Sequence, residues 1–366
     1  MSMTESGPAD RPATPGWSLD ETGIGVAIGK DNARALSPDR ALAFAAVDGP
    51  LGDRVGASMS SVERLLAAST RSSDPFVEEA ASHLVRAGGK RFRPLVVLLS
   101  AEFGDPSAPG VVPAAVVVEL THLATLYHDD VMDEAPRRRG GPSANARWGN
   151  TIAILTGDFL FARASDLLAD LGPEAVRLQA KTFEQLCTGQ IQESIGPSDG
   201  EDPVQHHLTV LDDKTGSLIA TSARFGAMLS GAGPAEIEAL TRFGHRIGVA
   251  FQLADDLVDI LSDGDTSGKT PGTDLREGVP TLATLMVIRD ADEDDRLRSL
   301  LHRPLTDESE HREALQLLRA HPALLEARRE ARRWADEARD ALAPLPMIPA
   351  REALERLCDY VVTRTA

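Results

Sequence analysis

The sequence predicts an all-α protein, and three observations support this fold class. Apolar residues recur at helical spacing from about residue 58 onward, as in Val62, Leu65 and Leu66. Strict alternation of apolar and polar residues never extends beyond about five positions, which argues against β-strands. No fixed-period repeat of a solenoid is present. The chain is therefore expected to form a bundle of long helices, which can hold a site in its core.

The predicted helices have recognisable starts and stops. Ser61 can cap the first helix, and Asp74-Pro75 begins the second with a capping carboxylate followed by proline. Gly88-Gly89 ends the second helix, and Pro94 begins a strongly apolar third one. The helices expected after the first span residues 76–86, 95–103, 114–132, 151–171, 174–195, 218–230 and 237–260, with others from about 281 and 314 to the end.

Composition suggests one folded domain preceded by an extension. Residues 1–57 are polar and rich in proline and glycine, so we expect a disordered extension, and residues 58–366 form a single domain. No stretch approaches the roughly 18 apolar residues of a membrane span, and the start lacks the pattern of a signal peptide. Cys187 and Cys358 are far apart, which favours a reducing, cytoplasmic location.

The charge balance restricts the class of partner. The formal net charge is −18, which argues against nucleic acid because phosphate backbones require a basic footprint. It does not argue against a phosphorylated substrate, since a few local cations can bind one in an acidic protein.

Two acidic clusters share the same spacing, Asp-Asp-x-x-Asp. On a helix, positions i and i+4 lie on one face, so the first and last aspartates of each cluster converge. Both clusters lie in apolar sequence, where like charges destabilise a helix unless a cation binds them. The alternative, two solvated acidic faces, does not explain the repeated spacing. The clusters consist of Asp129, Asp130 and Asp133, and of Asp255, Asp256 and Asp259.

The residue types in these clusters indicate which cation they bind. Carboxylate oxygens without histidine or cysteine favour a hard ion, and Mg²⁺ is typically held by one or two carboxylates together with substrate phosphates. Two facing clusters can thus bind several Mg²⁺ ions around one diphosphate. Gln252 lies one turn before Asp256 on the same helical face.

Basic residues gather in short motifs that suit phosphate. Lys90 and Arg93 follow the Gly88-Gly89 turn, and the basic loop 137–141 follows the first acidic cluster. The chain has only five lysines, and Lys90, Lys214 and Lys269 fall in such motifs. His122 lies two helical turns before Asp129, which favours a role at the anion site over that of a core histidine.

These motifs resemble those of the trans-isoprenyl diphosphate synthases, also called the polyprenyl synthetase family. The resemblance runs in family order from about residue 60 to 285, and it implies an isoprenoid-synthase-type helical bundle with a central cavity. The matching segments are Gly88–Pro94, His122 with His128–Asp133, Arg138–Gly140, Gly157–Leu160, Gly189-Gln190, Lys214-Thr215, Phe251–Asp256, Gly268-Lys269 and Gly272–Gly278.

The resemblance implies a Mg²⁺-dependent head-to-tail condensation of isopentenyl diphosphate with an allylic prenyl diphosphate, in a homodimer. It assigns Mg²⁺ to the six aspartates and stabilisation of the allylic cation to Lys214, Thr215 and Gln252. The allylic diphosphate would contact Arg138, Lys214, Thr215, Gln252 and Lys269. Isopentenyl diphosphate would contact Lys90, Arg93, His122 and Arg139. Where many members have lysine after Glu277-Gly278, this chain has Val279, and Arg276 is a candidate substitute.

The residues before the first acidic cluster bear on product length. A growing prenyl chain is expected to extend along this helix, past Ala124 and Thr125. Short-chain members commonly carry an aromatic residue there, whereas the nearest aromatic here is Tyr127, about 60° away around the helix. The small residues favour a product of about C30 to C50, of the kind found in quinone side chains, which can bring the protein near membranes. A C15–C20 product remains the alternative if Tyr127 or a neighbouring helix closes the path.

Two further alternatives share the fold. A class I terpene cyclase would line its pocket with aromatic residues, but only 4% of this chain is aromatic. A non-catalytic subunit of a heteromeric synthase would have eroded aspartate clusters, and both clusters are intact.

Overall fold

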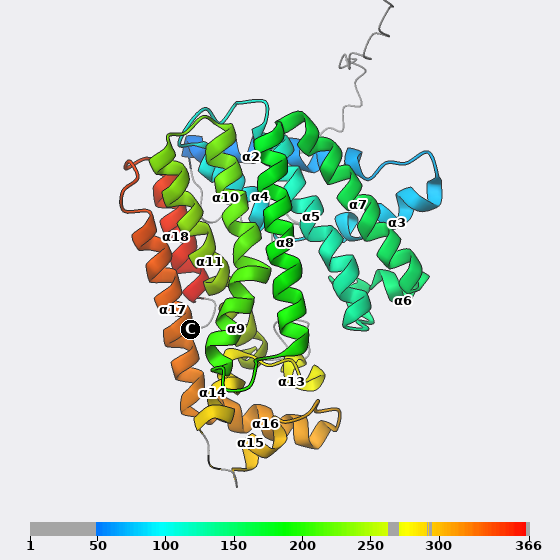
Figure 1. The fold of residues 1–366 in the computed structure, drawn as a ribbon, viewed down its shortest axis with the longest axis vertical. Helices are drawn as coiled ribbons and strands as arrows, with labels where there is room; N and C mark the ends of the chain where they lie inside the picture. The colour runs from blue at the N-terminus through cyan, green and yellow to red at the C-terminus, as the bar shows by residue number, and fades with distance from the viewer. Residues whose placement is uncertain (1–48, 263–270, 291, 293–294, 364–366) are drawn as a thin grey trace, which may run out of the picture. The chain divides into compact units, whose positions relative to one another are not determined.

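The computed structural model describes residues 49–262, 271–290, 292 and 295–363, all within one compact unit. These residues form α-helices joined by short loops, with one two-residue β-hairpin (Figure 1). The first half of the described chain contains α2 (Gly49–Ser69), α3 (Pro75–Arg86), α4 (Phe92–Ala101), α5 (Val111–Met132), β1 (Arg137–Arg138), β2 (Gly141–Pro142), α6 (Ala144–Trp148), α7 (Asn150–Leu171) and α8 (Pro173–Ile195). The second half contains α9 (Pro203–Leu211), the π-helix η2 (Asp212–Gly216), α10 (Ser217–Leu229), α11 (Pro234–Leu261), α13 (Thr273–Glu277), α14 (Leu282–Asp290), α15 (Arg296–Leu300), α16 (Glu308–Ala320), α17 (Pro322–Ala341) and α18 (Pro349–Thr363).

Helix α2 corrects the predicted domain boundary. The helix begins at Gly49, so the expectation of disorder is wrong for residues 49–57, while residues 1–48 lie outside the described residues. Leu51 and Val55 are buried and extend the apolar stripe of the helix towards its start. Glycines made this segment look unsuited to a helix, but α4 and α5 cover the stripe, and tertiary packing overrides propensity.

Helix α3 starts at the capping signal that the sequence predicted, whereas the predicted cap Ser61 lies inside α2 and donates to the carbonyl of Ala57. Asp74 accepts hydrogen bonds from the backbone N–H groups of Phe76 and Val77 at 2.8 and 3.3 Å, and Pro75 occupies the first helical position. Asp307 caps α16 in the same way through Ser309 and Glu310.

Helix α5 lies in the core and carries the first acidic cluster at its end. It packs against α7, α4, α10 and α2. Among the described helices, α5 alone is long and apolar enough to span a membrane by length and composition, but 67% of its most apolar window is buried inside the protein. Its apolar character is therefore accounted for by its place at the centre of the bundle.

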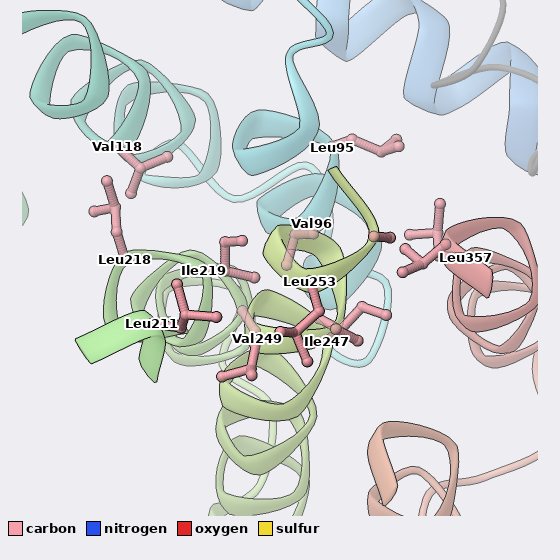
Figure 2. Close-up of a cluster of buried hydrophobic side chains, with 14 of the residues drawn as sticks. Leu95, Val96, Val118, Leu211, Leu218, Ile219, Ile247, Val249, Leu253 and Leu357 are labelled. Carbon is pink, nitrogen blue, oxygen red and sulfur yellow. The ribbon is translucent and has the colours of Figure 1, made fainter. Parts of the chain in front are cut away.

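Helix α11 carries the second acidic cluster and packs between α10 and α17 (Figure 1). Its apolar residues meet those of α4, α5, α10 and α18 in a continuous core. Figure 2 shows part of this core, including Val118 of α5, Leu218 of α10 and Leu253 of α11. The core fixes the relative positions of α5 and α11, and hence of the two acidic clusters.

Candidate functional site

The first acidic cluster occupies the C-terminal turn of α5. Asp130 is fully buried, and Arg138 Nε donates to its Oδ1 at 2.5 Å. The other carboxylate oxygen of Asp130 is buried without a hydrogen-bond partner among the described residues. Burial raises the pKa of Asp129 to about 6; nearby Lys214 opposes this effect and the negative charge of Asp133 adds to it. These aspartates are thus held in an environment that favours a bound cation.

The second acidic cluster lies in the last turns of α11. Burial, followed by the negative charge of Asp274, raises the pKa of Asp256 well above its usual range, although Gln252 Nε2 donates to Asp256 Oδ1 at 3.0 Å. Asp259 Oδ2 accepts the backbone N–H of Asp274 at 3.1 Å, which ties α13 to the end of α11. Lys90 Nζ lies 3.5 Å from Asp255 Oδ1, so this cluster also contacts the basic turn after α3.

Glu277, at the end of α13, connects the two clusters. Burial raises the pKa of its carboxyl group, and the charges of Asp133 and Asp259, one from each cluster, raise it further. We did not select Glu277 from the sequence, although it belongs to the segment that resembles the family. Among the described residues, no three acidic, histidine or cysteine side chains are close enough to ligate one ion directly.

Lys214 and Thr215 lie in the π-helix η2 and not at the start of an α-helix. Single π-turns occur frequently at functional sites. Lys214 Nζ donates to Glu193 Oε2 at 2.5 Å, and Thr215 Oγ1 lies 3.4 Å from Gln252 Oε1. Glu193 was missed in the sequence; its only signal is its spacing of four residues after Gly189 on α8. The π-turn therefore brings Thr215 next to Gln252 beside the second cluster, and brings Lys214 close enough to Asp129 of the first cluster to affect its pKa.

The basic residues of the turn after α3, Lys90, Arg91 and Arg93, have different roles. Arg91, which we did not select, adopts a left-handed conformation with φ of 49° and is buried. Its guanidinium donates to Glu119 Oε1 and Glu63 Oε1, both at 2.8 Å. Arg91 thus anchors the turn to α5 and α2, and the neighbouring residues Lys90 and Arg93 are left to face the site.

Arg93, His122 and Arg139 form a partly buried group with excess positive charge. Burial lowers the pKa of Arg93 to about 10. The pKa of His122 is held well below its usual range by burial and then by the charges of Arg93 and Arg139. Among the described residues, neither of these arginines forms an ion pair, and Arg93 Nε has no hydrogen-bond partner. An unpaired cationic group away from water is costly, so the free Nε of Arg93 makes this group suited to bind an anion.

A β-hairpin explains how the adjacent residues Arg138 and Arg139 contact different parts of the protein. Strands β1 and β2 are joined by Arg139 and Gly140, both with positive φ, which is typical of a tight two-residue turn. Arg138 consequently reaches Asp130, whereas Arg139 donates to the backbone carbonyls of Leu84 and Gly88. Gly89 next to it has a φ of 151°, which favours glycine, and a Cβ there would lie 3.0 Å from the Arg139 guanidinium.

The three residues selected for product length do not share one environment. Tyr127 is fully buried, and its hydroxyl donates to the carbonyl of Ala80 at 2.6 Å, so it is held against α3. Ala124 is also fully buried, and its carbonyl oxygen lies 3.0 Å from where a Cβ on Gly157 of α7 would stand. Thr125 is only partly buried. Of the three, Thr125 is thus the one that retains exposed surface near Asp129.

Two expectations about the segment after α11 have different outcomes. Lys269 lies outside the described residues. Arg276, the suggested substitute for the missing lysine, donates to Glu308 Oε1 of α16 at 2.9 Å. It is thus engaged with another helix, and Val279 is exposed.

Comparisons with known proteins agree with this arrangement. The family profile described as polyprenyl synthetase matches residues 74–318. The nonaprenyl diphosphate synthase of Mycobacterium tuberculosis is 52% identical over 312 residues, covering 85% of this chain and 93% of that protein. The structure of geranylgeranyl pyrophosphate synthase from Corynebacterium glutamicum, complexed with calcium and isoprenyl diphosphate, is 45% identical with a TM-score of 0.77, covering 87% of this chain and 98% of that one. The structure of a decaprenyl diphosphate synthase from Rhodobacter capsulatus is 32% identical with a TM-score of 0.78, covering 90% of this chain and 100% of that one. The chain therefore belongs to the polyprenyl synthetase family of all-α prenyltransferases.

Proposed function

We propose that the protein is a Mg²⁺-dependent synthase that condenses isopentenyl diphosphate with an allylic prenyl diphosphate to make a long all-trans polyprenyl diphosphate. The observation that carries this proposal is the presence of two different anion-binding arrangements in one core. One is the pair of aspartate clusters, which requires metal ions to attract a diphosphate. The other is the partly buried group of Arg93, His122 and Arg139, which can bind a diphosphate directly.

The allylic diphosphate is assigned to the aspartate clusters. Mg²⁺ held by Asp129, Asp133 and Asp255, with the other three aspartates in support, neutralises the diphosphate leaving group when bound. Lys214 is placed to add a positive charge on the same side, after exchanging its contact with Glu193. Oxygen dipoles of Thr215 and Gln252, 3.4 Å apart, can stabilise the developing allylic cation. Structures of relatives with calcium and isoprenyl diphosphate support a divalent cation.

Isopentenyl diphosphate is assigned to the partly buried cationic group. Arg93 and Arg139 offer planar donors suited to phosphate, and the charges of both act on His122. Lys90, which precedes Arg93 in the basic turn, lies 3.5 Å from Asp255 of the second cluster. Binding there would hold the double bond of the substrate towards the allylic cation, which converts the condensation into an effectively unimolecular step.

The raised pKa of Asp129 predicts a pH dependence of metal use. Protons compete with Mg²⁺ for a carboxylate whose pKa is about 6, so the charged, metal-binding form is lost as the pH falls through this value. The Mg²⁺ concentration that gives half-maximal rate should be nearly constant above about pH 7. It should rise by about tenfold for each pH unit below 6 if Asp129 dominates. Magnesium titrations at pH 5.0, 6.0 and 7.5 measure this, and a half-saturating concentration independent of pH would contradict it.

A long product is supported by the 52% identity to a nonaprenyl diphosphate synthase and by the small residues Ala124 and Thr125. The decisive experiment incubates the purified full chain with Mg²⁺, labelled isopentenyl diphosphate and a C5, C10, C15 or C20 allylic primer, and then sizes the products. We expect products of about C30 to C50. Products that end at C15 or C20 would assign the short-chain activity instead. No incorporation with any primer would overturn the proposed reaction.

We also propose a homodimer in the cytoplasm. Helices α7 and α8 pack together and expose large apolar side chains, which is unusual for a free surface. These side chains are Ile154, Leu155, Val176, Ile191 and Ile195. Light scattering should give about twice the chain mass of 39.1 kDa, and a single-chain mass at micromolar concentration would contradict the dimer.

A further inference from the structure

The π-turn η2 determines where the side chains of Lys214 and Thr215 point. The wide turn closes through the backbone N–H of Ser217, which donates to the carbonyl of Asp212, five residues earlier. The Ser217 hydroxyl donates to the next carbonyl, that of Asp213, at 2.5 Å. The turn lies between the α-helices α9 and α10, so an ordinary α-helical register is the obvious competing conformation.

Changing to that register would redirect both side chains. An α-helix turns by about 100° per residue, so removing the one-residue bulge rotates the preceding residues by about that angle relative to α10. Lys214 and Thr215 would then no longer face Glu193 and Gln252 as they do here. Since single π-turns are rare in helices, an interaction from outside the turn is needed to favour the observed register.

Helix α11 supplies contacts that hold this register. His245 Nδ1 lies 2.8 Å from Asp212 Oδ1, at the first residue of the turn. One turn further along α11, a Cβ on Gly248 would lie 2.7 Å from the Cα of Gly216, so the two backbones touch. Gln252, another turn along the same face, meets Thr215. The π-turn is thus held beside the second acidic cluster by three residues on successive turns of α11, namely His245, Gly248 and Gln252.

The pair of Asp212 and His245 is poorly suited to a role in stability alone. The two side chains are 39% and 34% exposed, and ion pairs with such exposure contribute little to folding. Neither residue was selected from the sequence, and neither contacts the aspartates of the two clusters in the structure. The pair does contact the one segment whose conformation determines where Lys214 points.

We propose that Asp212 and His245 are positioning residues, which hold η2 in its π-register and thereby aim Lys214 and Thr215 at the allylic diphosphate. This inference rests on the proposed function for its kinetic consequence, but not for its structural one. Loss of the pair should impair use of the allylic substrate, because small misplacements of a catalytic group have large kinetic effects. Use of isopentenyl diphosphate should change little, since its assigned residues lie on α4, α5 and the β-hairpin turn.

The test compares His245→Ala with His245→Asn in the full-length protein with Mg²⁺. The asparagine amide can place an N–H near the position of Nδ1, whereas alanine removes it. We expect kcat/KM for the allylic primer to fall about 10- to 100-fold in the alanine variant and to recover to within about threefold of wild type in the asparagine variant. The KM for isopentenyl diphosphate should stay within about twofold in both. Arg246→Ala is the matched control, because Arg246 is the next residue of α11 and forms a similarly exposed pair with Glu337 of α17 at 3.3 Å, not with the turn.

A second measurement does not depend on turnover. Amide hydrogen exchange of residues 210–218 without substrates should be faster in His245→Ala than in wild type and unchanged in Arg246→Ala. Exchange that is unaltered in His245→Ala would overturn the proposal, as would equal kinetic losses in the alanine and asparagine variants. If wild type shows no prenyl transfer, the proposed function fails, yet the exchange result still decides whether the pair holds the turn.

Discussion

Replacing Asp129 with alanine is expected to lower the rate of prenyl transfer by about 10³-fold or more at every Mg²⁺ concentration. Asp129 lies where burial and the charge of Asp133 make a cation necessary, and Lys214 approaches it from the π-turn. Loss of this ligand removes charge stabilisation at the departing diphosphate, for which a 10³-fold decrease corresponds to about 4 kcal/mol. Steady-state rates across a Mg²⁺ series measure the effect.

Asp255→Ala is expected to behave alike, because it removes a ligand from the facing cluster. This variant also removes the partner of Lys90 at 3.5 Å, so its KM for isopentenyl diphosphate should be measured as well. Asp336→Ala is a suitable control, since Asp336 is exposed on α17, far along the chain from either cluster. A rate near that of wild type in Asp129→Ala or Asp255→Ala, or recovery at high Mg²⁺, would refute the metal-binding role.

Replacing Arg91 with leucine is expected to lower the free energy of unfolding by about 3–5 kcal/mol. The substitution leaves the buried carboxylate of Glu119 without its partner at 2.8 Å and releases Glu63 of α2. The uncompensated buried charge of Glu119 is the largest part of this loss of stability. Denaturant unfolding followed by circular dichroism measures the difference.

Two further variants separate the causes of this loss. Arg54→Leu removes an ion pair to Glu102 whose arginine side chain is 52% exposed, and it should cost no more than about 1 kcal/mol. Combining Arg91→Leu with Glu119→Leu should recover part of the lost stability, because the buried charge is then removed. An Arg91→Leu protein as stable as wild type would show that the turn is anchored by other contacts.

Much of the site was accessible from the sequence because it depends on local geometry. The spacing of four residues places Asp129 with Asp133, and Asp255 with Asp259, on one helical face whatever surrounds them. Cations in short motifs, such as Lys90 and Arg93 after the Gly88-Gly89 turn, were likewise apparent as candidates for an anion site. Most of the long helices followed from periodicity. The start of α2 was misplaced, since its burial depends on α4 and α5, and α9 and the β-hairpin were not predicted.

Other residues could be assigned only from the tertiary structure. Arg91 looks like its neighbours Lys90 and Arg93 in sequence, but a left-handed backbone turns it towards Glu63 and Glu119. Likewise, Glu277 and Glu193 acquire their significance from distant partners, Asp133 with Asp259 for the first and Lys214 for the second.

The sequence by itself determined the fold class, the two aspartate clusters and the family, because helical periodicity and short spacings act over a few residues. The tertiary structure decided which cations anchor the protein and which face the site. It also decided that Tyr127 is bound to α3, and that a π-turn held by α11 presents Lys214. These outcomes depend on contacts between segments that are far apart in the chain. Their physical basis is burial, because a buried charge or polar group is unfavourable unless it has a specific partner.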